Sequence, residues 1–163
     1  MIIRECKLED AAILYRELGR NPEMLRYTGW NPYSSLESTK DFLSNVIASK
    51  EDYSWVVEEN GYIVGIIGAY DYCSQDESIE IGYSIFQKYW GKGYATQAIK
   101  LACDRLSIDR SVKLIKAWCA DENIASEKAL KRNGFVRKEI IESAINVCGE
   151  EYDQVIYEKE IMR

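Results

Sequence analysis

The sequence predicts an α+β or three-layer α/β fold with a mixed β-sheet. The predicted elements follow the order β-α-α-β-β-β-α-β-α-β-β along 163 residues. An Asn-Gly pair at residues 60–61, between two strand-like runs, indicates an antiparallel hairpin. Helices between later strands indicate crossover connections, which parallel strands require. Because no linker, repeat or shift in composition interrupts the chain, we expect residues 1–163 to form a single domain.

Hydrophobic periodicity locates each element in turn. Runs rich in β-branched and aromatic residues predict strands, and apolar residues at helical spacing predict helices. The second helix begins with Ser34-Ser35-Leu36-Glu37, which has the form of a capping box, and Gly134 ends the last helix. In chain order, the predictions are strand 1–6, helix 8–18, loop 21–33, helix 34–49, strands 53–59, 62–70 and 78–86, helix 91–109, strand 113–119, helix 123–133, and strands 135–142 and 152–160.

Composition excludes several classes of function. The chain contains no histidine, which removes Ser-His-Asp and Cys-His hydrolases, an imidazole general base and most catalytic zinc sites. Its five cysteines form no CxxC pair, so neither a disulfide framework nor a metal site is expected. The net charge of −6 argues against nucleic acid as a partner and suits a cationic partner such as an amine. Taken alone, the charge is better explained by solubility than by a cationic partner.

The expected location is the cytoplasm. The first residues are charged too early for a signal peptide. No apolar run approaches the ~18–20 residues of a membrane span, so no membrane partner is expected. Scattered, unpaired cysteines are typical of reduced thiols in a cytosol.

A glycine-rich turn between a strand and a helix gives the strongest functional signal. Strand 78–86 leads to Gly91-Lys92-Gly93, which opens the next helix. Free backbone N–H groups and the helix dipole make such a turn a cradle for a pyrophosphate. The turn lacks the third glycine of a dinucleotide fingerprint and the spacing of a P-loop. A bare G-x-G is also common in tight turns, so its context decides the interpretation.

Five stretches give that context, in order along the chain. They are residues 21–27, 79–83 (I-E-I-G-Y), 90–95 (W-G-K-G-Y-A), 123–135 with an N-x-x-S…GF pattern, and 152–157 with a D-x-x-x-Y pattern. Together they resemble the GNAT N-acetyltransferase superfamily, in the branch of ribosomal-protein N-terminal acetyltransferases and spermidine acetyltransferases. Residues 90–95 match its coenzyme A signature Q/R-x-x-G-x-G/A, with Trp90 at the Q/R position.

The resemblance implies a mostly antiparallel sheet flanked by helices on both faces, with acetyl-coenzyme A as cosubstrate and no metal. Backbone groups of Tyr83, Ser84 and Ile85 would then pair with the pantetheine arm like an added strand. Asn123 would lie beside the pantetheine, although it suits the N-cap of its helix equally well. The backbone N–H groups that would hold the pyrophosphate belong to Trp90, Gly91, Lys92, Gly93, Tyr94, Ala95 and Thr96.

Acetyl transfer to an amine needs a proton acceptor, a donor for the developing oxyanion and a donor for the departing thiolate. Glu80 is our candidate proton acceptor, directly or through a water, and its alternative role is a solvated carboxylate or a lysine partner. Family members often carry a tyrosine as thiolate acid where this chain has Leu130, so Ser126 becomes the candidate for that role. A covalent route through Cys119 is not expected, because nothing nearby in sequence would lower its pKa.

The resemblance therefore implies an N-acetyltransferase that acts on a primary amine, either a protein N-terminus or a small amine, by direct attack in a ternary complex. A cation site could be lined by Tyr27, Trp30, Tyr33, Tyr70, Asp71 and Tyr72, or these could be ordinary packing and rim residues. The alternative function is a non-catalytic acetyl-coenzyme A sensor or scaffold, which the absence of the tyrosine favours. An edge strand near the C-terminus leaves a homodimer open.

Overall fold

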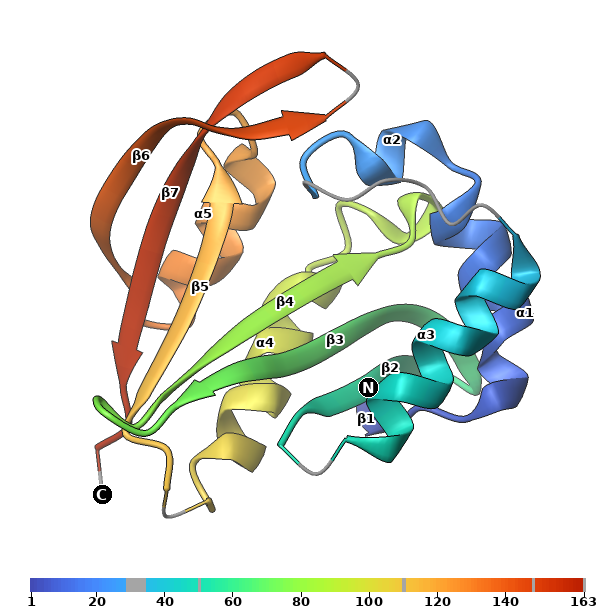
Figure 1. Ribbon diagram of the computed structural model, residues 1–163, viewed down its shortest axis with the longest axis horizontal. Helices are drawn as coiled ribbons and strands as arrows, with labels where there is room; N and C mark the ends of the chain where they lie inside the picture. The colour runs from blue at the N-terminus through green and yellow to red at the C-terminus, as the bar shows by residue number, and fades with distance from the viewer. Residues whose placement is uncertain (29–34, 50, 110, 148, 163) are drawn as a thin grey trace.

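A continuous seven-stranded sheet forms the centre of the computed structural model, which describes residues 1–28, 35–49, 51–109, 111–147 and 149–162. The strand order is β1-β2-β3-β4-β5-β7-β6 (Figure 1), and neighbours run antiparallel except β4 and β5, which are parallel. The elements are β1 Ile2–Glu5, α1 Ala11–Leu14, α2 Pro22–Leu25, α3 Leu36–Ala48, β2 Tyr53–Glu59, β3 Tyr62–Cys73, β4 Ser78–Ile85, α4 Tyr94–Leu106, β5 Leu114–Ala120, α5 Ile124–Arg132, β6 Val136–Val147 and β7 Glu150–Glu160.

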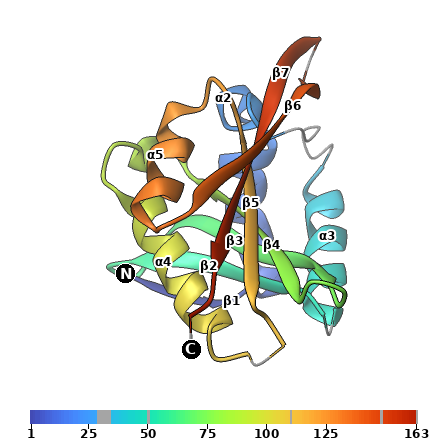
Figure 2. The same ribbon diagram turned by 90° about the vertical axis from the view of Figure 1, so that its left-hand side faces the viewer.

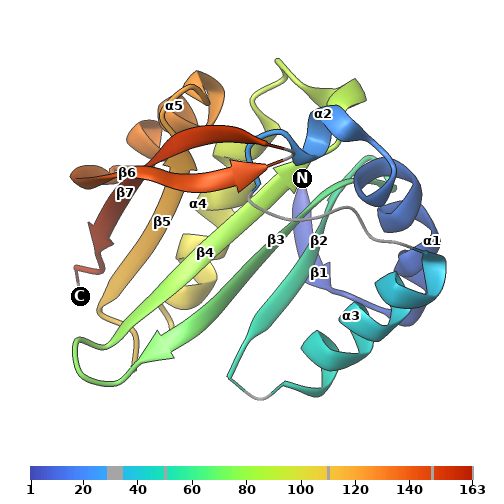
Figure 3. The same cartoon turned by 45° about the horizontal axis from the view of Figure 1, so that its top comes forward.

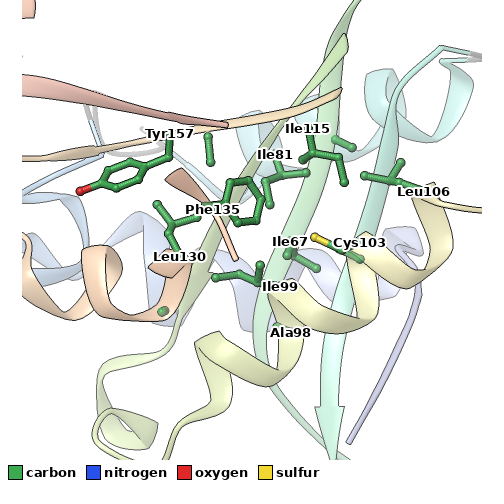
Figure 4. Close-up of a cluster of buried hydrophobic side chains, with 14 of the residues drawn as sticks. Ile67, Ile81, Ala98, Ile99, Cys103, Leu106, Ile115, Leu130, Phe135 and Tyr157 are labelled. Atoms are coloured by element: carbon green, nitrogen blue, oxygen red, sulfur yellow. The ribbon is translucent and has the colours of Figure 1, made fainter. Parts of the chain in front are cut away.

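Helices cover both faces of this sheet, with α4 and α5 on one side and α3 on the other (Figure 2). The side of α4 and α5 buries a cluster that includes Ile67, Ile81, Ile99, Leu106, Ile115 and Leu130 (Figure 4). The opposite side buries Leu14, Leu43, Val56 and Phe86. Each such side chain contributes ~1.5–3 kcal/mol through burial. The mixed, mostly antiparallel sheet between two helical layers confirms the predicted fold class.

Two predictions for the first third of the chain need correction. The helix expected over 8–18 is a 3-10 turn at Leu8–Asp10, then α1, then a π-helical turn at Tyr15–Gly19. The loop expected over 21–33 contains α2, which Pro22 starts and the Asn21 side chain caps.

The capping box of α3 lies one residue later than its sequence pattern indicates. Ser35, rather than Ser34, is the N-cap, and its side chain accepts from the backbone N–H of Ser38. Ser38 in turn accepts from the backbone N–H of Ser35 at 3.1 Å, so a serine closes the box in place of Glu37. The boundary therefore shifts, while the helix itself is confirmed.

The C-terminal hairpin is longer than predicted. β6 continues to Val147, beyond the expected end at residue 142, and β7 begins at Glu150. Its pairing register shifts between Ile141 and Ile145, and Ser143 adopts a positive φ of 48°. Such a bulge interrupts the two-residue alternation by which a strand is recognised in sequence.

The parallel pair β4 and β5 shapes the functional region. The two strands pair only where Ser78–Glu80 lie beside Leu114–Lys116. Beyond these residues the strands diverge and the sheet opens into a V, which is clear in Figures 1 and 3. α2 lies over the open end of this V (Figure 3).

Candidate active site

The divergence of β4 and β5 opens a cleft of about 670 Å³, a size typical of small-molecule sites. Its walls come from β4, the turn before α4, the start of α5, the end of β5 and the α2 segment. The cleft therefore reaches both faces of the sheet, because α2 and α5 lie on different sides of the strands. Two ligands can approach each other there from opposite directions.

One wall is the free edge of β4. The backbone N–H of Phe86 donates to the carbonyl of Val64 at 2.9 Å, which fixes the alternation of this antiparallel ladder. Ser84 accordingly directs its backbone groups toward β3, while Tyr83 and Ile85 direct theirs toward the open edge. Of the three residues expected to bind pantetheine through backbone groups, two have the required orientation. Ser84 also lines the cleft.

The Trp90 side chain fixes the end of that edge. Its indole N–H donates to the carbonyl oxygen of Ile85 at 2.7 Å. This bond ties the glycine-rich turn to the last residue of β4. Trp90 thus has a positioning role that its match to the signature did not reveal.

The glycine-rich turn has the geometry of an anion cradle. Gly91 and Gly93 adopt positive φ values of 75° and 76°, which other residues rarely take, and α4 begins at Tyr94. Within the described chain, no acceptor engages the backbone N–H groups of residues 91–96. These donors lie at the N-terminus of α4, where the helix dipole adds positive potential. Every predicted cradle residue lines the cleft except Lys92, whose ammonium lies 5.4 Å from the centre of the Tyr89 ring.

The start of α5 forms the facing wall. The Asn123 side chain caps the helix by accepting from the backbone N–H of Ser126 at 3.2 Å, and Asn123 also lines the cleft. The Ser126 hydroxyl oxygen lies 2.6 Å from the Tyr83 hydroxyl oxygen. Cys119 lines the cleft too, but burial raises the pKa of its thiol to about 11, so it is a poor nucleophile at neutral pH.

Glu80 stands behind the wall of the cleft instead of on it. Tyr70 lies opposite Glu80 in the sheet, and both Tyr70 and Trp118 line the cleft. Burial raises the pKa of the half-buried Glu80 carboxylate above its ordinary value, and the polar groups of Tyr70 and Trp118 oppose the rise only in part. Lys116 pairs with Asp76 at 2.6 Å, so the alternative role of Glu80 as a direct lysine partner is not observed.

The expected aromatic site is assembled in part. Tyr27 and Tyr70 line the cleft, whereas the Tyr72 hydroxyl donates to the carbonyl of Ser111 at 2.9 Å and Asp71 is not on the cleft wall. Trp30 and Tyr33 lie outside the described residues. Sequence reasoning missed several residues on the wall, among them Glu23, Trp118, Glu122, Lys128 and Arg132. The sequence did hold a signal for Trp118, because it is a large aromatic residue on the same strand face as Lys116.

Two further properties concern the described residues as a group. No cluster of three or more His, Cys, Asp or Glu side chains that could hold a metal ion occurs among them. None of the helices described is long and apolar enough to cross a membrane.

The chain is similar to known proteins over most of its length. Residues 1–136 match the model of the acetyltransferase (GNAT) domain family. Over 146 residues, 86% of this chain and 82% of the relative, the sequence is 24% identical to the uncharacterized N-acetyltransferase p20 of Bacillus licheniformis.

Two solved structures share the fold across almost the whole chain. One is RimL, a ribosomal L7/L12 alpha-N-protein acetyltransferase in complex with coenzyme A, with a TM-score of 0.90 and 18% identity over 98% of this chain and 93% of the other. The second is a spermidine N-acetyltransferase from Vibrio cholerae in complex with coenzyme A and spermine. Its TM-score is 0.89, with 20% identity over 98% of this chain and 94% of the other.

Proposed function

The protein belongs to the GNAT acetyltransferase family, and from this premise we propose that it transfers the acetyl group of acetyl-coenzyme A to a primary amine by direct attack in a ternary complex. The observation that carries the proposal is the cleft between β4 and β5. On one side of the cleft lie the anion cradle at residues 91–96 and the free edge of β4. On the other side lies Tyr70, with the Glu80 carboxylate behind it.

The residues present fit acetyl-coenzyme A. The cradle at residues 91–96 offers unengaged N–H groups to a pyrophosphate. The free edge offers the backbone groups of Tyr83 and the N–H of Ile85 to the amides of the pantetheine arm, as a neighbouring strand would, while the Ile85 carbonyl accepts from Trp90. Bound there, the cosubstrate would supply the thioester that the amine attacks.

The amine side of the cleft is acidic and aromatic. Glu23 and Glu122 supply negative charge, and Tyr27, Tyr70 and Trp118 supply aromatic rings, which attract cations; the Tyr27 ring already has the Arg26 guanidinium 5.4 Å from its centre. A bound ammonium must lose a proton before its nitrogen can attack. We assign that proton to Glu80 by way of the Tyr70 hydroxyl, which stands between the carboxylate and the cleft.

The acceptor is a protein N-terminus or a small amine. The named relatives support this class, since they include enzymes that act on spermidine and on the ribosomal protein L7/L12. The argument for a sensor was the absence of a tyrosine at position 130. Leu130 is fully buried in the core and does not line the cleft, so this absence does not favour a sensor.

We also propose that residues 1–163 act as one cytoplasmic domain able to pair as a homodimer. The continuous sheet from β1 to β7 supports a single domain. The free thiols of the described cysteines support a cytoplasmic location. The exposed edge strand β6, on which Ile140 and Ile141 are each 42% exposed, supports pairing as a homodimer. Sedimentation of the wild type and of Ile140→Lys would test the pairing.

The test of the function is a transfer assay read by mass spectrometry. The protein is mixed with acetyl-coenzyme A and, separately, with N-terminal peptides, polyamines and amino acids. We expect a mass gain of one acetyl group on members of one class, and that class names the acceptor. Binding of acetyl-coenzyme A without transfer to any class would contradict the proposal and favour a sensor.

A further inference from the structure

Two hydroxyl groups meet on the α5 side of the cleft. The Tyr83 and Ser126 oxygens lie 2.6 Å apart, although the residues are 43 positions apart in sequence. The Tyr83 oxygen also lies 3.5 Å from the carbonyl of Ser126. Both residues line the cleft beside Cys119. A pair so short requires that one hydroxyl donates to the other, which orders the hydrogen of the donor.

The direction of this hydrogen bond follows from the groups around it. A phenol is a stronger donor than an aliphatic hydroxyl, and burial raises the pKa of Tyr83, which keeps its proton in place at all physiological pH values. With Tyr83 as the donor, the Ser126 oxygen accepts and its own hydrogen is free to point elsewhere. Ser126 and Cys119 line the cleft together, and the Ser126 hydroxyl lowers the pKa of the Cys119 thiol against the larger rise that burial causes. That hydroxyl therefore already lies in a position suited to a sulfur partner.

We propose that Tyr83 is a positioning residue that holds the Ser126 hydroxyl so that it donates a hydrogen bond to the departing sulfur of coenzyme A. This inference rests on the proposed function. In the reaction the amine nitrogen forms a bond to the acetyl carbon, and the C–S bond breaks with its electron pair going to sulfur. The amine proton goes to Glu80 through Tyr70. Ser126 stabilises the thiolate without giving up its proton, and donation from Tyr83 strengthens that hydrogen bond.

Position 130 takes no part in this arrangement. Leu130 on α5 is fully buried and packs in the core with Phe135 and Ile99 (Figure 4). The two hydroxyl groups that meet on this side of the cleft come from Tyr83 on β4 and Ser126 near the start of α5.

The test compares Tyr83→Phe, Ser126→Ala and the double variant with the wild type. The Tyr83→Phe change keeps the ring and its packing and removes only the hydroxyl. Tyr62→Phe is the matched control, because Tyr62 is 69% exposed at the β2–β3 hairpin, away from the cleft. Turnover and KM for acetyl-coenzyme A are measured with one amine, and thermal unfolding with coenzyme A reports folding and binding.

We expect Ser126→Ala to lower kcat about 10- to 100-fold, as loss of a hydrogen bond to a charged group does, and Tyr83→Phe to lower it roughly 10-fold. KM for acetyl-coenzyme A and the stabilisation by coenzyme A should stay near wild type in both. The double variant should be no slower than Ser126→Ala, because Tyr83 acts through Ser126.

Three results would overturn the inference. If Tyr83→Phe turns over like Tyr62→Phe while the wild type transfers acetyl groups, Tyr83 has no role in positioning and the proposed function stands. Losses that multiply in the double variant would mean that Tyr83 acts independently of Ser126. If the wild type transfers no acetyl group to any amine, both the inference and the proposed function fail.

Discussion

Tyr70 on β3 stands directly opposite Glu80 on β4, and burial and the Glu80 carboxylate together raise the pKa of the Tyr70 phenol, with burial contributing most. Tyr70 lines the cleft and Glu80 does not. The pair therefore connects a half-buried carboxylate to the space where an amine would bind. Burial raises the pKa of both groups, so the phenol keeps its proton and the carboxylate becomes a better base.

Replacement of Glu80 by Gln should lower kcat/KM by roughly 10²–10⁴-fold, the usual contribution of a general base. Because the pKa of Glu80 is raised, the wild-type rate should fall on the acidic side at a pH above the ordinary titration range of glutamate. That acidic limb should be absent in Glu80→Gln. A pH–rate profile of both proteins measures this, and an identical limb in the variant would assign the titration to another group.

Gly82 makes room for the Tyr70 phenol. A Cβ atom at this position would lie 2.6 Å from the Tyr70 hydroxyl oxygen, closer than real side chains approach. Gly82→Ala should therefore displace the phenol from Glu80 and reduce turnover about 10-fold or more. In a Tyr70→Phe background the same change should cost less, because the closest atom is gone. Equal costs in both backgrounds, measured as kcat ratios, would show that Gly82 serves another purpose.

Tyr27 is held at the amine side of the cleft by Tyr152. The two ring centroids lie 5.2 Å apart at 73°, an edge-to-face contact worth ~0.5–1.5 kcal/mol. Tyr152→Ala should raise KM for the amine roughly 2- to 10-fold and leave KM for acetyl-coenzyme A unchanged. Tyr152→Phe is the control, since it keeps the ring contact and loses only the hydroxyl that donates to Glu150. A rise in KM for acetyl-coenzyme A instead would place Tyr27 on the cosubstrate side.

Asp10 ties β1 to the turn that follows it. Burial opposes its ionisation, but two 2.9 Å bonds from Arg4 and one from the backbone N–H of Lys7 together lower its pKa. Because the folded-state pKa is lowered, this stabilisation is present above the unfolded-state pKa and is lost as pH falls through the folded-state value. Asp10→Asn should reduce the free energy of unfolding by about 1.5–3 kcal/mol at pH 7, with a smaller difference near pH 3. Urea denaturation at the two pH values checks this, and an equal difference at both would contradict it.

The parts of the site that the sequence predicts are those with local signals. The strand, glycine turn and helix follow one another along the chain from Ser78 to Leu106. Positions 91 and 93 favour glycine because both adopt a positive φ. Asn123 caps α5 because its side chain needs only the backbone of Ser126. Such features depend on a few neighbouring residues, so periodicity and turn chemistry reveal them.

The contacts that make the site chemically specific join distant segments. The meeting of Tyr83 with Ser126 depends on where β4 and β5 separate, and no local pattern marks that point. The Tyr70–Glu80 pair depends on a register shift between Tyr70 and Cys73, where Asp71 takes a positive φ of 56° without a glycine to signal it. Sequence alone could name Glu80 as a base but could not show that Tyr70 stands between it and the cleft.

Transfer of an isotopically labelled acetyl group distinguishes direct attack in a ternary complex from a route through an acetylated cysteine. The protein is mixed with labelled acetyl-coenzyme A with and without an amine acceptor, and both the amine and a peptide map of the protein are read by mass spectrometry. The account predicts label on the amine and none on Cys119, whose buried thiol has a pKa of about 11. Label retained on Cys119 and released when amine is added would contradict direct attack, and absence of labelled amine would contradict the proposed activity.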